Sequence, residues 1–154
     1  MSDEFYQTVE DKFIFKVKKG LLYTEDDVWL KIDGKKSRIG VTDFFQRRGG
    51  DIVYVVLPDV ESKVDMQDEI IQFETIKAVS TIKSPLSGTI ESVNDALREK
   101  PELVNEDPYG EGWLVIIAPQ KLKENLKKLL TAEEYFKSMK LKIKNDLKKN
   151  KQEA

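Results

Sequence analysis

The chain of 154 residues contains no cysteine and no histidine. Without cysteine it can form no disulfide, thiolate zinc site or thiol nucleophile, and without histidine it lacks the commonest general base. Any redox chemistry must therefore come from an attached group. The lack of cysteine also fits a reducing compartment. Because the sequence shows neither an apolar leader nor an apolar run long enough to span a bilayer, we expect a cytoplasmic protein.

Charge is distributed unevenly. Residues 1–120 hold 15 Lys and Arg against 23 Asp and Glu, a net charge of −8, whereas residues 121–154 hold 11 Lys against 5 acids, a net charge of +6. A basic tail can bind nucleic acid. Here, however, its lysines alternate with apolar residues at helical spacing, which favours amphipathic helices that dock on the acidic body. The apolar positions are Leu122, Leu126, Leu129, Leu130, Phe136, Met139, Ile143 and Leu147.

The centre of the chain alternates short β-type runs with turn signals, which is typical of a β-sandwich or barrel. Asp33-Gly34 predicts a hairpin turn between the second and third runs, and prolines at positions 58 and 85 end later runs. The predicted strands are Phe13–Val17, Val28–Ile32, Ser37–Val41, Ile52–Val56, Ile70–Thr75, Ala78–Lys83, Gly88–Val93 and Trp113–Ile117.

Helices are predicted at a few capped positions. Thr42 caps a short helix that stops at Gly49-Gly50, and Asp95–Lys100 predicts a further helical turn. Pro119-Gln120 predicts the start of one tail helix, and Thr131 with Glu134 forms a capping box for the next. We therefore divide the chain into an N-terminal extension (1–20), a β domain (21–118), and C-terminal helices with a basic tail (119–154).

Lys77 stands out within the run FETIKAVS, residues 73–80. A lysine in a β-branched, apolar stretch must bring its ammonium group to water, which places it at a strand edge or a turn. No Gly, Asn or Asp lies between Ile70 and Lys83, so local propensity alone predicts one long strand. A solvated strand lysine is the plain interpretation, and a modified lysine is the functional one.

Several motifs in order favour the functional interpretation. The runs GVTDF, GDIVYVVLPDV, ETIKAVS, SPLSG and PELVNEDPYGEGW, between Gly40 and Trp113, resemble the H protein of the glycine cleavage system. The resemblance implies a flattened β-barrel or sandwich of the lipoyl/biotinyl type with C-terminal helices. It implies that Lys77 lies at a hairpin tip and carries lipoic acid. Glu74 matches a family carboxylate that either helps a lipoylating enzyme recognise the hairpin or is a surface acid.

The resemblance also implies a function. A lipoate ligase or lipoyl transferase would modify Lys77, and the arm would carry an aminomethyl group from glycine decarboxylase to aminomethyltransferase. Dihydrolipoamide dehydrogenase would then reoxidise it. The chain would be a carrier, not an enzyme, and is expected to be a monomer that does not bind membranes or nucleic acid. The run Tyr109–Trp113 also matches the family, and we interpret it as specifying the fold.

Two departures from the family pattern concern the site that would shelter the loaded arm. A family His-Glu-Trp run reads Asp27-Val28-Trp29 here, and an Asp after the modified lysine is replaced by Thr81. The neighbouring acids Glu25, Asp26 and Asp27 could substitute. The departures leave open an H-like lipoate-binding protein that carries sulfur for a heterodisulfide-reductase-like system, and a non-lipoylated interaction or lipoyl-relay module.

Overall fold

The computed structural model describes residues 4–153, with side chains described from Glu4 to Lys149. The strands are β1 Phe5–Glu10, β2 Phe13–Lys18, β3 Leu22–Tyr23, β4 Val28–Asp33, β5 Lys36–Val41, β6 Ile52–Val56, β7 Lys63–Val64, β8 Glu69–Thr75, β9 Val79–Lys83, β10 Gly88–Val93, β11 Val115–Pro119 and β12 Leu130–Thr131. The helices are α1 Asp43–Gly49, the 3-10 turn η1 Asp95–Arg98, α2 Leu103–Glu106, α3 Leu122–Leu126 and α4 Ala132–Glu153.

The strands form three antiparallel sheets. The largest has the order β12-β3-β4-β5-β11-β10-β7, the second is β6-β8-β9, and β1 pairs with β2 alone. The second sheet lies against the first, and their inner faces share a core that includes Leu30, Ile39, Ile117, Phe73 and Ile82. The mainly β fold with C-terminal helices is confirmed. In the described part of the chain no sheet closes on itself, so the arrangement is a sandwich.

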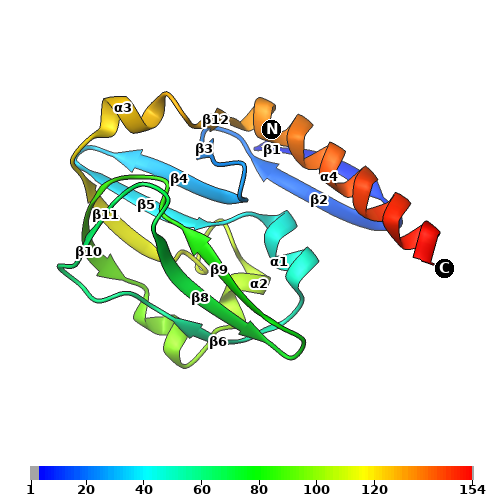
Figure 1. The fold of residues 1–154 in the computed structure, drawn as a ribbon, viewed down its shortest axis with the longest axis horizontal. Helices are drawn as coiled ribbons and strands as arrows, with labels where there is room; N and C mark the ends of the chain where they lie inside the picture. Colours follow the sequence, from blue (N-terminus) through cyan, green and yellow to red (C-terminus); the bar gives the residue numbers. More distant parts are fainter. Residues whose placement is uncertain (1–3, 154) are drawn as a thin grey trace.

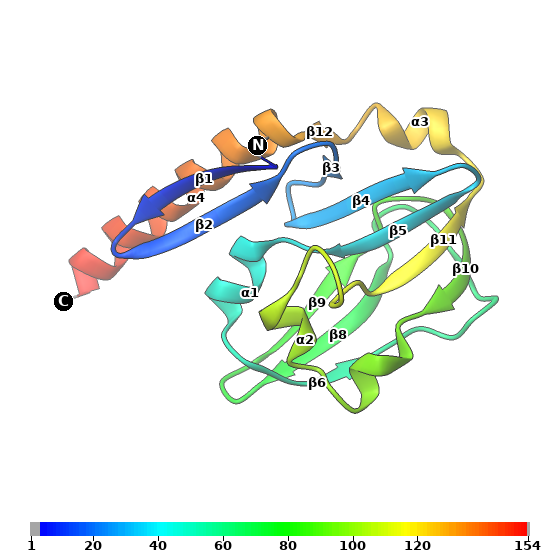
Figure 2. The same ribbon diagram turned by 180° about the vertical axis from the view of Figure 1, so that it is seen from behind.

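A second core joins the two ends of the chain. Figures 1 and 2 both show the β1–β2 hairpin lying beside α4, away from the three-stranded sheet. Tyr6 stacks on Phe136 with ring centroids 5.4 Å apart, and Tyr135, Met139 and Ile143 of α4 are buried. The α4 part of the predicted apolar stripe, Phe136, Met139, Ile143 and Leu147, therefore packs against the body, whereas Leu122 and Leu126 of α3 belong to neither core. The lysines of α4 mostly face solvent on the opposite side of the helix.

The predicted caps are present. The Thr42 hydroxyl accepts a hydrogen bond from the amide of Phe45 (3.2 Å) at the start of α1. At the start of α4 the Thr131 amide donates to the Glu134 carboxylate (2.9 Å), and the Glu134 amide donates to the Thr131 hydroxyl (3.2 Å). Together these last two bonds form the predicted capping box.

Several elements were not predicted from the sequence, among them the two-residue strands β3, β7 and β12 and the short helix α2. Strand β1 was missed because its turn to β2 has no Gly or Asn; Asp11 and Lys12 take positive φ values of 48° and 73° there instead. The prediction that Pro119-Gln120 begins a helix is wrong. Pro119 is the last residue of β11, opposite Gly88 of β10, so pairing with β10 extends the strand, and α3 begins at Leu122.

The run Tyr109–Trp113 fixes the fold as interpreted. The Tyr109 hydroxyl donates to the carbonyl of Lys16 (2.8 Å), and the indole N–H of Trp29 donates to the carbonyl of Pro108 (3.0 Å). A Cβ at Gly112 would collide with the backbone carbonyl of Leu103, so only glycine fits there. This loop thus locks the N-terminal hairpin and β4 to the rest of the body.

Candidate functional site

Lys77 lies at the tip of the β8–β9 hairpin. Residues 76–78 connect the two strands, whose register pairs Glu74 with Val79 and Phe73 with Ser80. Figure 1 shows this hairpin extending beyond the body, below α1. The expectation of one long strand from local propensity is wrong, and the hairpin implied by the family resemblance is present.

Thr75 explains the turn. Its amide donates to the Ala78 carbonyl (2.9 Å), and its hydroxyl accepts from the Ala78 amide (3.1 Å) and lies 3.2 Å from the Ala78 carbonyl. A threonine side chain can close a turn in this way without glycine. None of the three tip residues has a positive φ value, so an ordinary residue such as lysine is tolerated at the tip.

The Lys77 side chain is exposed, as are all residues from Ile76 to Ser80. Ile76 is 87% exposed, an unusual setting for a large apolar residue. Among the described residues the Lys77 ammonium makes no hydrogen bond or ion pair. The charge therefore reaches water at a turn, as predicted, and the amine is accessible to another protein.

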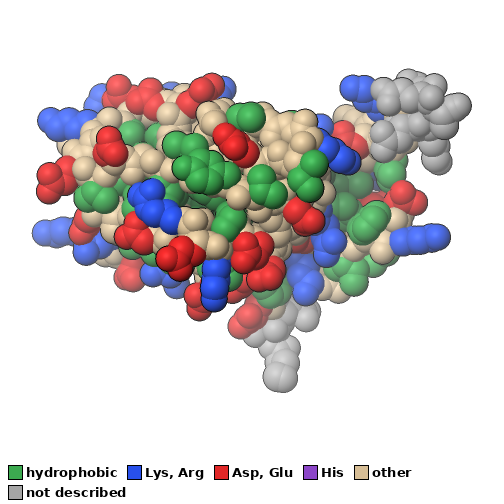
Figure 3. All heavy atoms as spheres, turned by 90° about the horizontal axis from the view of Figure 1, so that it is seen from below, with side chains coloured by type: hydrophobic (Ala, Val, Ile, Leu, Met, Phe, Trp, Pro, Cys, Tyr) green, Lys and Arg blue, Asp and Glu red, His purple; other side chains and the backbone are tan. Residues whose placement is uncertain are grey.

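The outer face of the sheet next to Lys77 is apolar with one acid. Tyr54, Glu74 and Val79 form one row across β6, β8 and β9, and Tyr54 and Val79 are more than half exposed. Glu74 is half-buried between them. Figure 3 views the molecule from the side on which β6 lies and shows apolar side chains in small groups among charged ones.

A cleft of about 440 Å³ lies beside the hairpin. One wall is β9, through Ser80, Thr81 and Lys83. The other walls are the turn 25–27 before β4, the end of α1 and the side chain of Lys142 on α4. Thr81 thus faces the cleft.

Val28 does not face this cleft. It is fully buried in the main core, on the same side of β4 as Leu30. The hypothesis that Val28 replaces an acid of a sheltering site is therefore wrong for this chain, because a carboxylate there would lie among apolar side chains. The acid that reaches the cleft from the buried part of the turn is Asp27, one residue earlier.

Asp27 is held in place by the turn and by α4. It has a φ of 68°, and its backbone carbonyl accepts from the Thr42 amide (3.0 Å). Its Oδ1 accepts from the Tyr135 hydroxyl (2.6 Å) and from the Lys142 ammonium (3.0 Å). Burial, and then the Asp27 charge, raise the pKa of Tyr135 well above its usual range, so that the phenol stays a donor.

The other two acids of the turn are exposed. Glu25 accepts from the Ser138 hydroxyl (2.9 Å), and its backbone carbonyl accepts from Lys142. The Asp26 carboxylate forms no hydrogen bond or ion pair with another described residue. Helix α4 therefore engages two of the three acids that could substitute for the missing family carboxylate.

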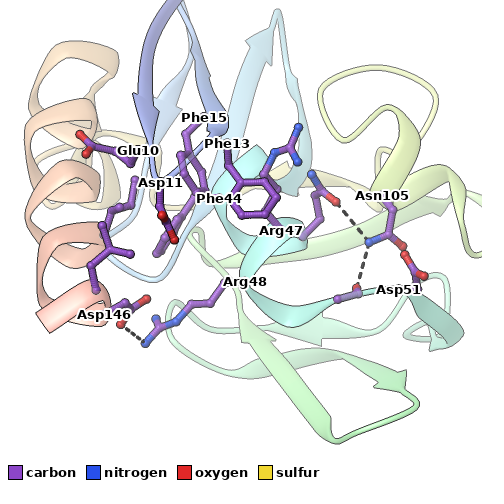
Figure 4. A pocket seen from close by; sticks show the side chains of 14 residues that line it. Glu10, Asp11, Phe13, Phe15, Phe44, Arg47, Arg48, Asp51, Asn105 and Asp146 are labelled. Atoms are coloured by element: carbon purple, nitrogen blue, oxygen red, sulfur yellow. Dashed lines mark hydrogen bonds and ion pairs between the residues drawn. The ribbon is translucent and has the colours of Figure 1, made fainter. Parts of the chain in front are cut away.

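A second groove, of about 380 Å³, lies on the other side of α1 (Figure 4). Phe13, Phe15 and Phe44 line it, and the ion pair between Arg48 and Asp146 (3.2 Å) crosses its lower end. The N-terminal hairpin supplies part of its wall. Because Arg48 also lines the cleft, α1 and this ion pair separate the two hollows.

The comparisons with known proteins agree with the fold. Residues 21–142 match the family described as "Glycine cleavage H-protein". The chain belongs to this family. The "Probable glycine cleavage system H protein" of Thermococcus gammatolerans is 45% identical over 124 residues, covering 80% of this chain and 92% of the relative. The "Glycine cleavage system H protein" of Geobacillus thermodenitrificans is 44% identical over 117 residues, covering 76% and 91%.

A solved structure also matches. The glycine cleavage system H protein of Mycobacterium marinum superposes with a TM-score of 0.71 at 34% identity, and the match covers 77% of this chain and 95% of that one. The family match begins at Leu21, so the β1–β2 hairpin lies outside it. No described helix is long and apolar enough to cross a membrane.

Sequence reasoning missed Tyr135 and Lys142 as residues of the site. On an amphipathic helix, a tyrosine is usually packed against the core and a lysine is usually solvated, so neither residue type indicates a functional site by itself. Only the fold brings them to Asp27, which lies more than 100 residues earlier in the chain.

Proposed function

We propose that this chain is a lipoate carrier of the glycine cleavage system, with lipoic acid attached through an amide bond to Lys77. The observation that carries the proposal is the accessible amine of Lys77 at the tip of a hairpin, inside the region that matches the family. The partners would be glycine decarboxylase, aminomethyltransferase and dihydrolipoamide dehydrogenase, with a lipoate ligase or lipoyl transferase to load the arm. The chain would act in the cytoplasm as a monomer.

The residues around Lys77 suit attachment. The tip is exposed on all sides, so an enzyme can enclose the lysine, and the Thr75 bonds hold the turn in one conformation. The attached dithiolane would supply the redox and group-transfer chemistry, since its disulfide can be reduced to a thiol and a sulfur that bears the cargo. The chain contributes attachment, reach and shelter.

The cleft lies within reach of such an arm. Ser80, near the start of β9, is three residues after Lys77, so the two lie at most about 10 Å apart along the chain, and the lysine stem plus the lipoyl chain is longer than this. Thr81 and the turn 25–27 lie around the same hollow. A cationic aminomethyl group placed there would be shielded from solvent and near the carboxylates of the turn.

The matched relatives are described as glycine cleavage proteins, so we propose this role in preference to sulfur transfer or a non-lipoylated relay. The test is reconstitution. The chain is incubated with lipoate ligase, ATP and lipoate, and then with glycine decarboxylase and glycine, and the products are followed by intact mass and peptide mapping. One lipoyl adduct on Lys77, followed by an aminomethyl adduct, supports the proposal.

Lys77→Arg is the matched control, because arginine keeps the charge but offers no comparable amine. It should fold normally and acquire neither adduct. A lipoyl group on a different lysine, or efficient modification of Lys77→Arg, would show that the site is wrong. Lipoylation without aminomethyl loading would support Lys77 as the attachment point but contradict the role in glycine cleavage.

We also propose that Glu74 contributes to recognition by the lipoylating enzyme. Its side chain is half-buried between the more exposed side chains of Tyr54 and Val79. Glu74 and Val79 form the β8–β9 pair next to the hairpin tip. Glu74→Gln should slow lipoylation severalfold while leaving the melting temperature unchanged. Glu69→Gln, on the same strand but at its far end, is the control and should be lipoylated at the normal rate. Equal rates for both variants would make Glu74 a surface acid only.

A further inference from the structure

The cleft beside the lipoyl hairpin contains a lysine that belongs to the chain itself. The Lys142 side chain is 27% exposed, and its ammonium lies 3.0 Å from Oδ1 of Asp27, whose side chain is 11% exposed. The same ammonium donates to the carbonyl of Glu25. Two contacts from different residues fix the position of Lys142 at the wall of the cleft.

The charges around the cleft balance. Glu25, Asp26 and Asp27 face Arg48, Lys83 and Lys142. Arg48 is already paired with Asp146 (3.2 Å), so Lys142 is the cation that the structure places directly on the turn. A second cation that approached Asp27 would meet a carboxylate that already accepts from Lys142 and Tyr135.

We propose that Lys142 is a built-in cation that pairs with the acidic wall of the cleft, which is the turn formed by Glu25, Asp26 and Asp27. This pairing determines how tightly the cleft holds a cationic cargo. An aminomethyl group on the arm is an alkylammonium ion and needs a carboxylate partner when it leaves water. In this chain the buried carboxylate of the cleft is Asp27, and Lys142 competes for it. The proposal deepens the proposed function and rests on it for the identity of the cargo.

The competition has a chemical consequence. An aminomethyl thioether reacts with water to give a free thiol, formaldehyde and ammonium, a hydrolysis that needs no oxidant. The rate of this loss depends on how well the cleft holds the amine and excludes water. Lys142 would therefore make the loaded arm leave the cleft more readily, which favours release to a partner enzyme over storage.

The first test uses the protein without lipoate, so that it does not depend on carrier activity. The unlipoylated chain is titrated with methylammonium chloride, and the backbone amide signals of Asp27, Val28 and Ser80 are followed by NMR. Removal of the Lys142 charge frees the Asp27 carboxylate and should tighten methylammonium binding about three- to fivefold. We expect this in Lys142→Met, while Lys142→Arg should behave like the wild type.

Lys144→Met is the matched control, because it removes the same charge from an exposed position on the same helix. It should leave methylammonium binding unchanged. If Lys142→Met and Lys144→Met bind methylammonium equally, the effect is one of net charge, and the role of Lys142 is overturned. The same conclusion follows if neither variant differs from the wild type.

The second test measures the lipoylated, aminomethyl-loaded proteins in the absence of aminomethyltransferase. Formaldehyde release should be about three- to fivefold slower in Lys142→Met than in the wild type or Lys144→Met. Equal release rates would overturn the proposal even if all three proteins load normally. Failure of every variant to load would instead count against the proposed function and leave the methylammonium result to decide the role of Lys142.

Discussion

The Tyr135 hydroxyl lies 2.6 Å from Oδ1 of Asp27 and donates a hydrogen bond to it, joining α4 to the turn before β4. The same hydroxyl lies 2.9 Å from the hydroxyl of Thr42. Because the phenol donates to the carboxylate, Thr42 donates to Tyr135. The N-cap residue of α1, the turn before β4 and helix α4 are thus joined through the buried phenol of Tyr135.

Tyr135→Phe should destabilise the fold. The change leaves the Thr42 hydroxyl without its acceptor and removes one of the two donors of Asp27, which should lower the free energy of unfolding by about 1–3 kcal/mol. Urea unfolding followed by fluorescence measures this. Tyr54→Phe makes the same chemical change at a side chain that is 53% exposed, and should shift stability by less than about 0.5 kcal/mol. Similar losses in both variants would contradict the role given to Tyr135.

Stability should fall at alkaline pH. Burial is the main cause that raises the pKa of Tyr23, Tyr109 and Tyr135 above the usual value of about 10. Above that pH the unfolded chain loses these protons while the folded chain keeps them, so the stabilisation is complete below about pH 10 and decreases as the pH rises further. Each tyrosine should contribute a slope of about 1.4 kcal/mol per pH unit.

Urea unfolding between pH 8 and pH 11, with tyrosinate absorbance as a second probe, tests this expectation. Tyrosinate formation at the three buried residues should coincide with unfolding. Full ionisation of all tyrosines in a still-folded protein would contradict it.

Removal of β12 and α4 should cost much of the stability. A chain that ends at Leu129 keeps α3 but uncovers the face on which Tyr135, Met139 and Ile143 pack, and such side chains contribute about 1.5–3 kcal/mol each. Circular dichroism melting measures the loss. A chain that ends at Leu147 retains these residues and should melt near the full-length temperature. Equal melting of both truncated chains would mean that the helix does not support the fold.

Thr75→Val should loosen the hairpin tip without unfolding the protein. The substitution keeps the shape but removes the hydroxyl that bonds to Ala78, so the Ala78 amide should exchange with solvent faster and lipoylation should slow severalfold. Hydrogen exchange by NMR and the ligase rate measure both effects. Thr89→Val on β10 is the control and should change neither. Normal lipoylation of Thr75→Val would show that a fixed tip is not needed.

Much of the fold could be predicted because its signals are local. Alternating apolar residues identified most strands, and a Thr and Glu three residues apart identified the start of α4. The position of Val28 could also have been inferred, because Val28 and Leu30 occupy the same face of a strand with period two. The family motif led instead to the wrong surface for this residue.

The sequence indicated two parts of the candidate site, the lysine proposed as the attachment point and the acids of the turn 25–27. Lys77 is identified by its motif, whereas the turn beneath it depends on a side-chain bond from Thr75 that propensity does not register. The pairing of Lys142 with Asp27 depends on how α4 docks, which involves residues more than 100 positions apart. No local pattern contains that information, so the pairing of Lys142 with the turn is seen only in the assembled fold.

The shared core of the two chain ends has a consequence for biosynthesis. Tyr6 is synthesised 130 residues before Phe136, on which it stacks. The part of the β1–β2 hairpin that packs on α4 therefore stays uncovered until α4 has been synthesised. Closing such a long loop is slow compared with forming local contacts. The N-terminal hairpin and α4 should accordingly be the last parts to acquire native packing in each newly made molecule.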